Sequence, residues 1–294
     1  MEKIVPHLWY DREAFEAAGL YTSTFEDSRI VSRTSIEGTP SGAVEMLTIV
    51  LSGQEFMMIS AGPFFRFTPA ISFLVACESK DEVRRKWARL HEGGKELMPL
   101  GSYPFSEEYS WLEDRYGLSW QLMYMGDRPW RRKMTPTLMF TRERCGKAEE
   151  AVLRYAGIFR DSRVTEMLHY GPDEKPNTTG MIKHAGFILE GQDFAAMDSA
   201  LDLEAGFNEA VSFVVRCDSQ EEIDRYWDDL SARPEAEQCG WLKDRYGVSW
   251  QIVPSILDEM MGAGDAARRG RVTRALLNMK KLDIAGLKKA YAQD

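Results

Sequence analysis

Histidine is the residue type whose placement most directly suggests chemistry in this 294-residue chain. His184 lies in the strand-like run GMIKHAGFIL and could face a cleft as a general acid or base, because imidazole titrates near neutral pH. His7 lies in a similar run, IVPHLWY. Ordinary hydrogen bonding is the alternative for both residues. We therefore take His184 as the candidate catalytic residue and His7 as a candidate ligand-binding residue.

Two stretches repeat each other closely: WLEDRYGLSWQL starts at Trp111 and WLKDRYGVSWQI at Trp241, with nine of twelve positions identical. Gln121 and Gln251 occupy the same place in both stretches, and their amides could hydrogen-bond a polar ligand. Trp111 and Trp241 could wall a cleft, although aromatic residues in strands more often belong to a core. The Asp-Arg pair of each DRYG turn is expected to be structural, because aspartate favours tight turns.

The four cysteines form no CxxC pair, so neither a zinc cluster nor a disulfide framework is predicted. Cys239 precedes Gly240 and Trp241, where a nucleophile is conceivable. Nothing nearby in the sequence lowers its pKa, which favours a buried thiol instead.

Charge and hydropathy exclude several classes of protein. The net charge is -9 and the pI is near 5.2, and this negative charge disfavours binding to nucleic acid. The basic residues near the C-terminus are expected to form a solvated helix face. No apolar run approaches the ~20 residues that span a bilayer, and the N-terminus lacks the pattern of a signal peptide. We expect a cytoplasmic protein that associates with neither membranes nor nucleic acid.

The repeat extends over most of the chain. FEDSRI, LSGQEF and AISFLVACES in the first half match FRDSRV, LEGQDF and AVSFVVRCDS in the second, in the same order. These matches predict domains at residues 3–126 and 133–254, a linker at 127–132 and a helical tail at 255–294.

Within each copy the signals follow one order, β-α-β-β-β, and then repeat in weaker form. Ser79 with Glu82, and Ser219 with Glu222, predict a capping box at the start of the helix in each second unit. The fold class is therefore α+β, with each copy expected to curve its two units around a cleft of its own.

Paired β-α-β-β-β units resemble the vicinal oxygen chelate fold of glyoxalase I, extradiol dioxygenases and bleomycin-resistance proteins. The motifs TPTLMF, LEGQDF, QEEIDRYWDDLS and QCGWLKDRYGVSWQIVP resemble its PhnB-like branch, some members of which are labelled 3-demethylubiquinone-9 3-methyltransferase. The second copy matches more faithfully, so its cleft is expected to be the better preserved. No glycine-rich loop suited to S-adenosylmethionine is present, which disfavours methyl transfer.

The resemblance implies metal ligands on four strands of the fold. Carried across, these places offer, in the first and second copy respectively, Pro6 or His7 and Pro136 or Thr137 on the first strand, Met58 and Ala196 on the fourth, Ala70 or Ile71 and Ala210 or Val211 on the fifth, and Gln121 and Gln251 on the last. A neutral amide is a poor ligand for a catalytic metal, so we expect neither a metal nor another cofactor.

Three functions remain open. The first is metal-independent binding of an apolar or aromatic small molecule, with Gln251, Trp241, Gln121, Trp111 and His7 as ligand-binding residues. The second is an isomerase, lyase or transferase acting in the second copy's cleft through His184 or Gln251. The third is a structural or protein-interaction role. We expect either a monomer with pseudo-dimeric halves or a homodimer, because PhnB-like proteins generally pair two copies.

Overall fold

A computed structural model describes residues 2–39, 42–201, 203, 205–263 and 266–292. Each copy contains the two predicted units. The first copy consists of β1 (Ile4–Tyr10), α1 (Ala14–Thr24), β2 (Arg29–Thr39), β3 (Gly42–Leu51), β4 (Gln54–Ser60), β5 (Ile71–Cys77), α2 (Lys80–Leu90), β6 (Lys95–Tyr103), β7 (Ser106–Glu113) and β8 (Ser119–Tyr124). The second consists of β9 (Met134–Phe140), α3 (Ala148–Ile158), β10 (Arg163–His169), β11 (Ile182–Leu189), β12 (Gln192–Asp198), β13 (Val211–Cys217), α4 (Gln220–Leu230), β14 (Trp241–Lys243) and β15 (Ser249–Pro254), with short 3-10 helices at Arg142–Arg144 and Pro234–Ala236.

The tandem vicinal oxygen chelate fold is confirmed, but its units combine across the copies. The seven-stranded sheet has the order β14-β15-β13-β1-β4-β3-β2, and the eight-stranded sheet has the order β10-β11-β12-β9-β5-β8-β7-β6. The joints are antiparallel pairs, β1 with β13 and β9 with β5. The expectation of one sheet and one cleft per copy is therefore wrong, because each sheet takes one unit from each copy.

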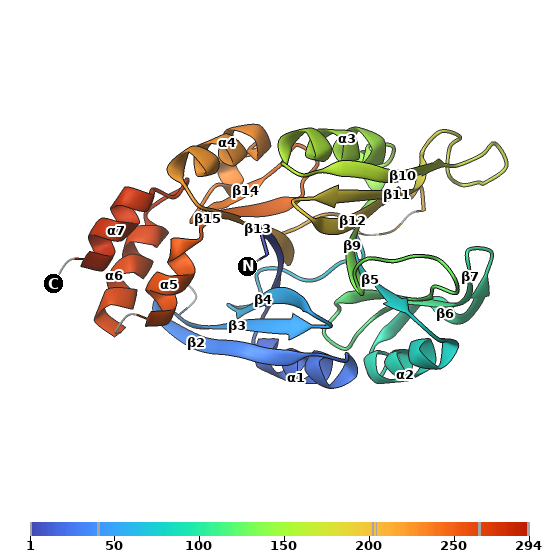
Figure 1. Cartoon of the computed structure of the whole chain (residues 1–294), viewed down its shortest axis with the longest axis horizontal. Helices are drawn as coiled ribbons and strands as arrows, with labels where there is room; N and C mark the ends of the chain where they lie inside the picture. The colour runs from blue at the N-terminus through green and yellow to red at the C-terminus, as the bar shows by residue number, and fades with distance from the viewer. Residues whose placement is uncertain (1, 40–41, 202, 204, 264–265, 293–294) are drawn as a thin grey trace.

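The helices cover the outer faces of the two sheets. The seven-stranded sheet is covered by α1 and α4, and the eight-stranded sheet by α2 and α3. Figure 1 shows α3 and α4 along one side of the molecule, α1 and α2 along the opposite side, and the tail helices at one end. Among the described residues, no helix is long and apolar enough to span a membrane.

The DRYG turns hold the core of each half together. Asp244 accepts hydrogen bonds from the Tyr155 hydroxyl at 2.6 Å and the Trp250 indole at 3.0 Å, and also from the backbone amides of residues 246 and 248. Asp114 has the equivalent partners in the first copy. Burial raises the pKa of both carboxyls. The structural role predicted for these aspartates agrees with this geometry.

The C-terminal tail forms three helices, α5 (Ile256–Ala263), α6 (Ala266–Leu277) and α7 (Ile284–Ala292). Met260, Val272, Leu282 and Leu287 form the centre of a separate small hydrophobic cluster within it. The buried Arg216 of β13 fastens the tail to the sheet, because its guanidinium donates to Asp258 of α5 at 3.0 Å and to both carboxylate oxygens of Glu55 in β4. The tail is therefore fixed to strands from both copies.

Candidate functional site

One candidate site is a cavity of about 660 Å³ between the seven-stranded sheet and the tail. Most of its wall is apolar. Its hydrophobic lining comprises Trp9, Ile36, Val44, Met46, Met57, Ile59, Ala61, Phe64, Phe65, Val214, Ala236, Cys239, Trp241, Leu242, Val253, Pro254, Leu257, Met261, Leu276 and Leu277. A volume of this size and an apolar wall are typical of sites for small organic molecules.

His7 lies in the wall of this cavity, on β1 in the middle of the sheet. Burial lowers the pKa of its imidazole to about 4, so the ring is neutral at physiological pH. Its Nδ1 atom is buried and has no hydrogen-bond partner among the described residues. The ring packs edge-on against the Trp241 indole, with 5.5 Å between the centroids. A neutral, unpaired imidazole can donate to or accept from a bound molecule.

Gln251 lines the same cavity from β15. Its amide Nε2 donates to the Ser212 hydroxyl at 3.0 Å, whereas no described residue donates to its Oε1. The hydroxyls of Ser249 and Thr273, which also line the cavity, are buried without a partner in the described part of the chain. Unpaired buried polar groups cost free energy, so a ligand that supplies their partners would gain affinity.

The matching glutamine of the first copy is differently placed. Gln121 lies in the eight-stranded sheet, where its Nε2 donates to Ser72 at 2.8 Å and its Oε1 accepts from the Tyr109 hydroxyl at 2.7 Å. In the second copy Cys239 takes the place of Tyr109, and the amide oxygen of Gln251 loses that donor. The two glutamines are thus equivalent in sequence, but only Gln251 has an atom available for a ligand.

Trp111 and His184 also lie in the eight-stranded sheet, away from this cavity. The Trp111 indole donates to Ser119 at 2.7 Å. The pKa of His184 is lowered by burial, an effect opposed in part by Glu166 at 3.6 Å. Of the six residues taken from the sequence, the structure brings His7, Trp241 and Gln251 together and leaves Trp111, Gln121 and His184 in the other sheet.

The half-buried Cys239 lines the cavity, but burial raises the pKa of its thiol. A thiol with a raised pKa is a poor nucleophile at neutral pH. The geometry therefore gives no support to a nucleophilic Cys239.

The residues at the implied metal positions do not fit a catalytic metal. The cavity-lining residues at or next to the implied positions on β1, β4 and β15 are His7, Met57 and Gln251, and Val214 lines the cavity from β13. They offer one imidazole, one thioether and one neutral amide, without a carboxylate or thiolate. Within the described residues, no group of three His, Cys, Asp or Glu side chains could hold a metal ion. Met58, the position taken from the sequence, is buried in the core, and its neighbour Met57 faces the cavity.

Several lining residues could not be found from the sequence. Leu257, Met261, Leu276 and Leu277 belong to the tail, and Met46, Met57 and Ile59 belong to strands of the first copy. Met46, Met57 and Ile59 alternate with core residues, which shows that they lie on one face of β3 and β4. The alternation does not show which part of the chain packs against that face.

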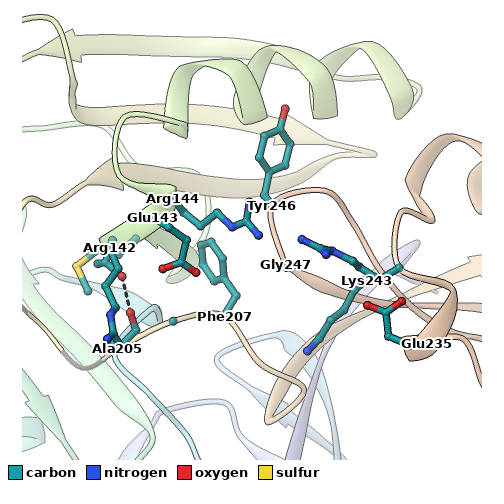
Figure 2. A pocket seen from close by; sticks show the side chains of 13 residues that line it. Arg142, Glu143, Arg144, Ala205, Phe207, Glu235, Lys243, Tyr246 and Gly247 are labelled. Carbon is teal, nitrogen blue, oxygen red and sulfur yellow. Dashed lines mark hydrogen bonds between the residues drawn. The ribbon is translucent and has the colours of Figure 1, made fainter.

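A second, polar cavity of about 320 Å³ shares two lining residues with the first, and Figure 2 shows its lining. Glu235 and Lys243 line both cavities. The polar cavity is also lined by Phe207 and Tyr246 and by the charged residues Arg142, Glu143, Arg144 and Arg233. The site as a whole therefore has an apolar compartment and a charged one.

The chain has the vicinal oxygen chelate fold, and solved structures agree. Glyoxalase I from Zea mays is similar over 88% of this chain and 96% of its own, with a TM-score of 0.54 and 12% identity. A mutant of the same enzyme is similar over 87% of this chain and 95% of its own, with a TM-score of 0.56 and 13% identity. At such low identity the likeness is one of fold alone.

The family follows from the sequence match. The model of the 3-demethylubiquinone-9 3-methyltransferase family matches residues 2–123 and again residues 132–253, and the chain belongs to that family. The PhnB protein from Bacillus cereus is 41% identical over 42% of this chain and 99% of its own, with a TM-score of 0.40. No match was found among curated proteins.

Proposed function

We propose that this protein binds an apolar or aromatic small molecule, without a metal, in the cavity between the seven-stranded sheet and the tail. The observation that carries the proposal is the combination of a 660 Å³ apolar cavity with unpaired polar atoms on His7, Gln251 and Ser249. Apolar walls supply affinity by removing ligand surface from water, and a few polar groups orient the ligand.

Native mass spectrometry of the purified protein, followed by calorimetric titration with 1-decanol and 2-naphthol, tests the proposal. The double variant Met46→Trp, Met57→Trp places two indoles in the cavity and is expected to weaken binding at least tenfold, because volume is lost to the larger side chains. The matched control is His184→Trp, since His184 on β11 occupies the position of Met46 on β3 in the other sheet. Equal binding by the wild type and the double variant would exclude this cavity as the site.

A second candidate is an enzyme that moves a proton on a ligand held in the same cavity. This candidate is favoured by His7, because its imidazole is neutral and its Nδ1 has no partner among the described residues. His7 lines the cavity, whereas His184 does not. Gln251 would polarise the ligand through its amide. Conversion of a ligand identified by mass spectrometry, and its loss in His7→Gln, would distinguish this enzyme from a binding protein.

The proposal includes a cytoplasmic location, which is consistent with the four free cysteines. It also includes a monomer or a homodimer, and we favour the monomer because each sheet already pairs one unit from each copy.

A further inference from the structure

The polar cavity shares the lining residues Glu235 and Lys243 with the apolar one, and Lys243 is the last residue of β14. Figure 2 shows Arg142, Glu143 and Arg144 on one wall, and Lys243 and Glu235 on the opposite wall. Because Lys243 and Glu235 line both spaces, a molecule whose body fills the apolar cavity can present one end to these charges.

The charges of the polar cavity favour an anion. Its lining has four cations, Arg142, Arg144, Arg233 and Lys243, and two carboxylates, Glu143 and Glu235. Lys243 is paired with Glu209 at 2.8 Å. Within the described part of the chain, no carboxylate lies within ion-pair distance of any of the three guanidinium groups. Guanidinium groups without a partner are well suited to carboxylate or phosphate oxygens.

The first copy lacks this arrangement. The connection from strand to helix is seven residues long in the second copy, 141–147, against three in the first, 11–13, and the additional residues include Arg144. Asp11 and Glu113 of the first copy occupy the places of Thr141 and Lys243, although Arg66 adds a cation where the second copy has Gly206. The second copy has therefore gained positive charge where its cavity opens.

The backbone of this connection is held in a rare conformation. Arg142 has a φ of +51°, and its counterpart Arg12 is not among the residues with positive φ. A non-glycine residue in the left-handed region is strained by about 1 kcal/mol or more and is often found near functional sites. Arg142 and Arg144 line the polar cavity together with Phe207, Arg142 with an exposed side chain and Arg144 half-buried.

We propose that the ligand is amphipathic, with an anionic head group, carboxylate or phosphate, that binds Arg144 and Arg233 while its apolar body extends past Lys243 into the larger cavity. This inference rests on the proposed function, because it assigns the ligand's body to the same apolar site.

The test compares probes with one chain length and different heads: 1-decanol, decanoate and decyl phosphate, titrated into the full chain by calorimetry. At least one of the anions is expected to bind about tenfold more tightly than the alcohol, and the larger gain identifies the head group. The advantage should fall to within about twofold in Arg144→Gln, Arg233→Gln, and at high salt. Arg12→Gln is the matched control and should retain the full advantage.

The outcomes separate the two proposals. If the alcohol and both anions bind equally well, the anionic head group is wrong while the apolar site stands. If no probe binds, the proposed function itself fails. An anion preference that survives loss of both arginines would assign the head group to other residues and would overturn the inference.

Discussion

The imidazole of His7 packs edge-on against the indole of Trp241, 5.5 Å away, although the two residues belong to different copies of the repeat. This contact exists because β1 of the first copy pairs with β13 of the second, so that β15 and β14, which follow β13 in the strand order, belong to the same sheet as β1. It places a neutral imidazole in the wall of an apolar cavity. Neither copy alone supplies both residues of the site.

The first prediction concerns His7 and pH. Its pKa is about 4 in the folded protein and 6.5 for an unperturbed side chain, so between these values the unfolded state binds more protons. The free energy of unfolding should fall by up to ~3 kcal/mol as the pH drops from 6.5 to 4, and should be insensitive to this group above 6.5. Urea unfolding of the wild type and His7→Gln at several pH values measures the effect. Parallel pH dependences in the two proteins would contradict it.

The second prediction concerns the DRYG aspartates. Asp244→Ala removes the acceptor of four hydrogen bonds and leaves Tyr155 and Trp250 with buried, unpaired donors. The expected loss of stability is about 3 to 5 kcal/mol. Asp114→Ala should cost a similar amount, because its partners in the first copy are the same. Chemical denaturation measures both variants. A loss below about 1 kcal/mol in either would show that water replaces the carboxylate.

The sequence was sufficient for the units but not for their assembly. The serine caps are as predicted, since the Ser79 hydroxyl accepts from the amide of Glu82 at 3.1 Å and the Ser219 hydroxyl from that of Glu222 at 3.2 Å. The glutamate half of the capping box differs, because Glu82 and Glu222 accept from the amides of Glu78 and Asp218, one residue before each serine. A cap depends on residues three apart, so it can be recognised locally. The partner of β1 cannot, because β5 and β13 have nearly the same sequence. Which of them β1 pairs with depends on the packing of the whole molecule.

The same limit explains which site residues were found. Gln121 and Gln251 are indistinguishable in the repeated motif. The difference lies in the neighbouring segment, where the Tyr109 hydroxyl donates to the amide oxygen of Gln121, whereas Cys239 at the matching position provides no such donor to Gln251. The sequence did not identify Arg144 as a site residue. It lies in a loop that is longer than its counterpart in the first copy, and only the structure shows that this loop lines a cavity together with Phe207 and Lys243.

The third prediction uses the cysteines as reporters of cavity occupancy. Cys239 lines the cavity and Cys145 does not, and both are half-buried with the thiol pKa raised by burial. At pH 8 both should react slowly with iodoacetamide, and 1-decanol should protect Cys239 alone. Cys77 and Cys217, whose pKa is raised to about 12, should stay unmodified in the folded protein. Mass spectrometry of peptides measures each rate. Equal protection of Cys145 would indicate a general change in structure instead of occupancy.

The last prediction concerns how the tail closes the cavity. Arg216 is buried and joins Asp258 of α5 to Glu55 of β4, so it connects the tail to the sheet. Asp258→Asn weakens only the tail side of this network, because the paired carboxylate oxygens of Glu55 remain. Amide exchange in α5 and α6 should therefore accelerate about tenfold while exchange in β1 and β13 is unchanged.

Asp228→Asn is the matched control, since Asp228 pairs with Lys281 of the tail at a place away from the cavity lining. If α5 and α6 cover the cavity as a hinged unit, Asp258→Asn should also speed the dissociation of 1-decanol, whereas Asp228→Asn should not. Faster exchange without faster dissociation would mean that ligands leave by another route. The polar cavity beside Arg144 is the candidate for that route, because Glu235 and Lys243 line both cavities.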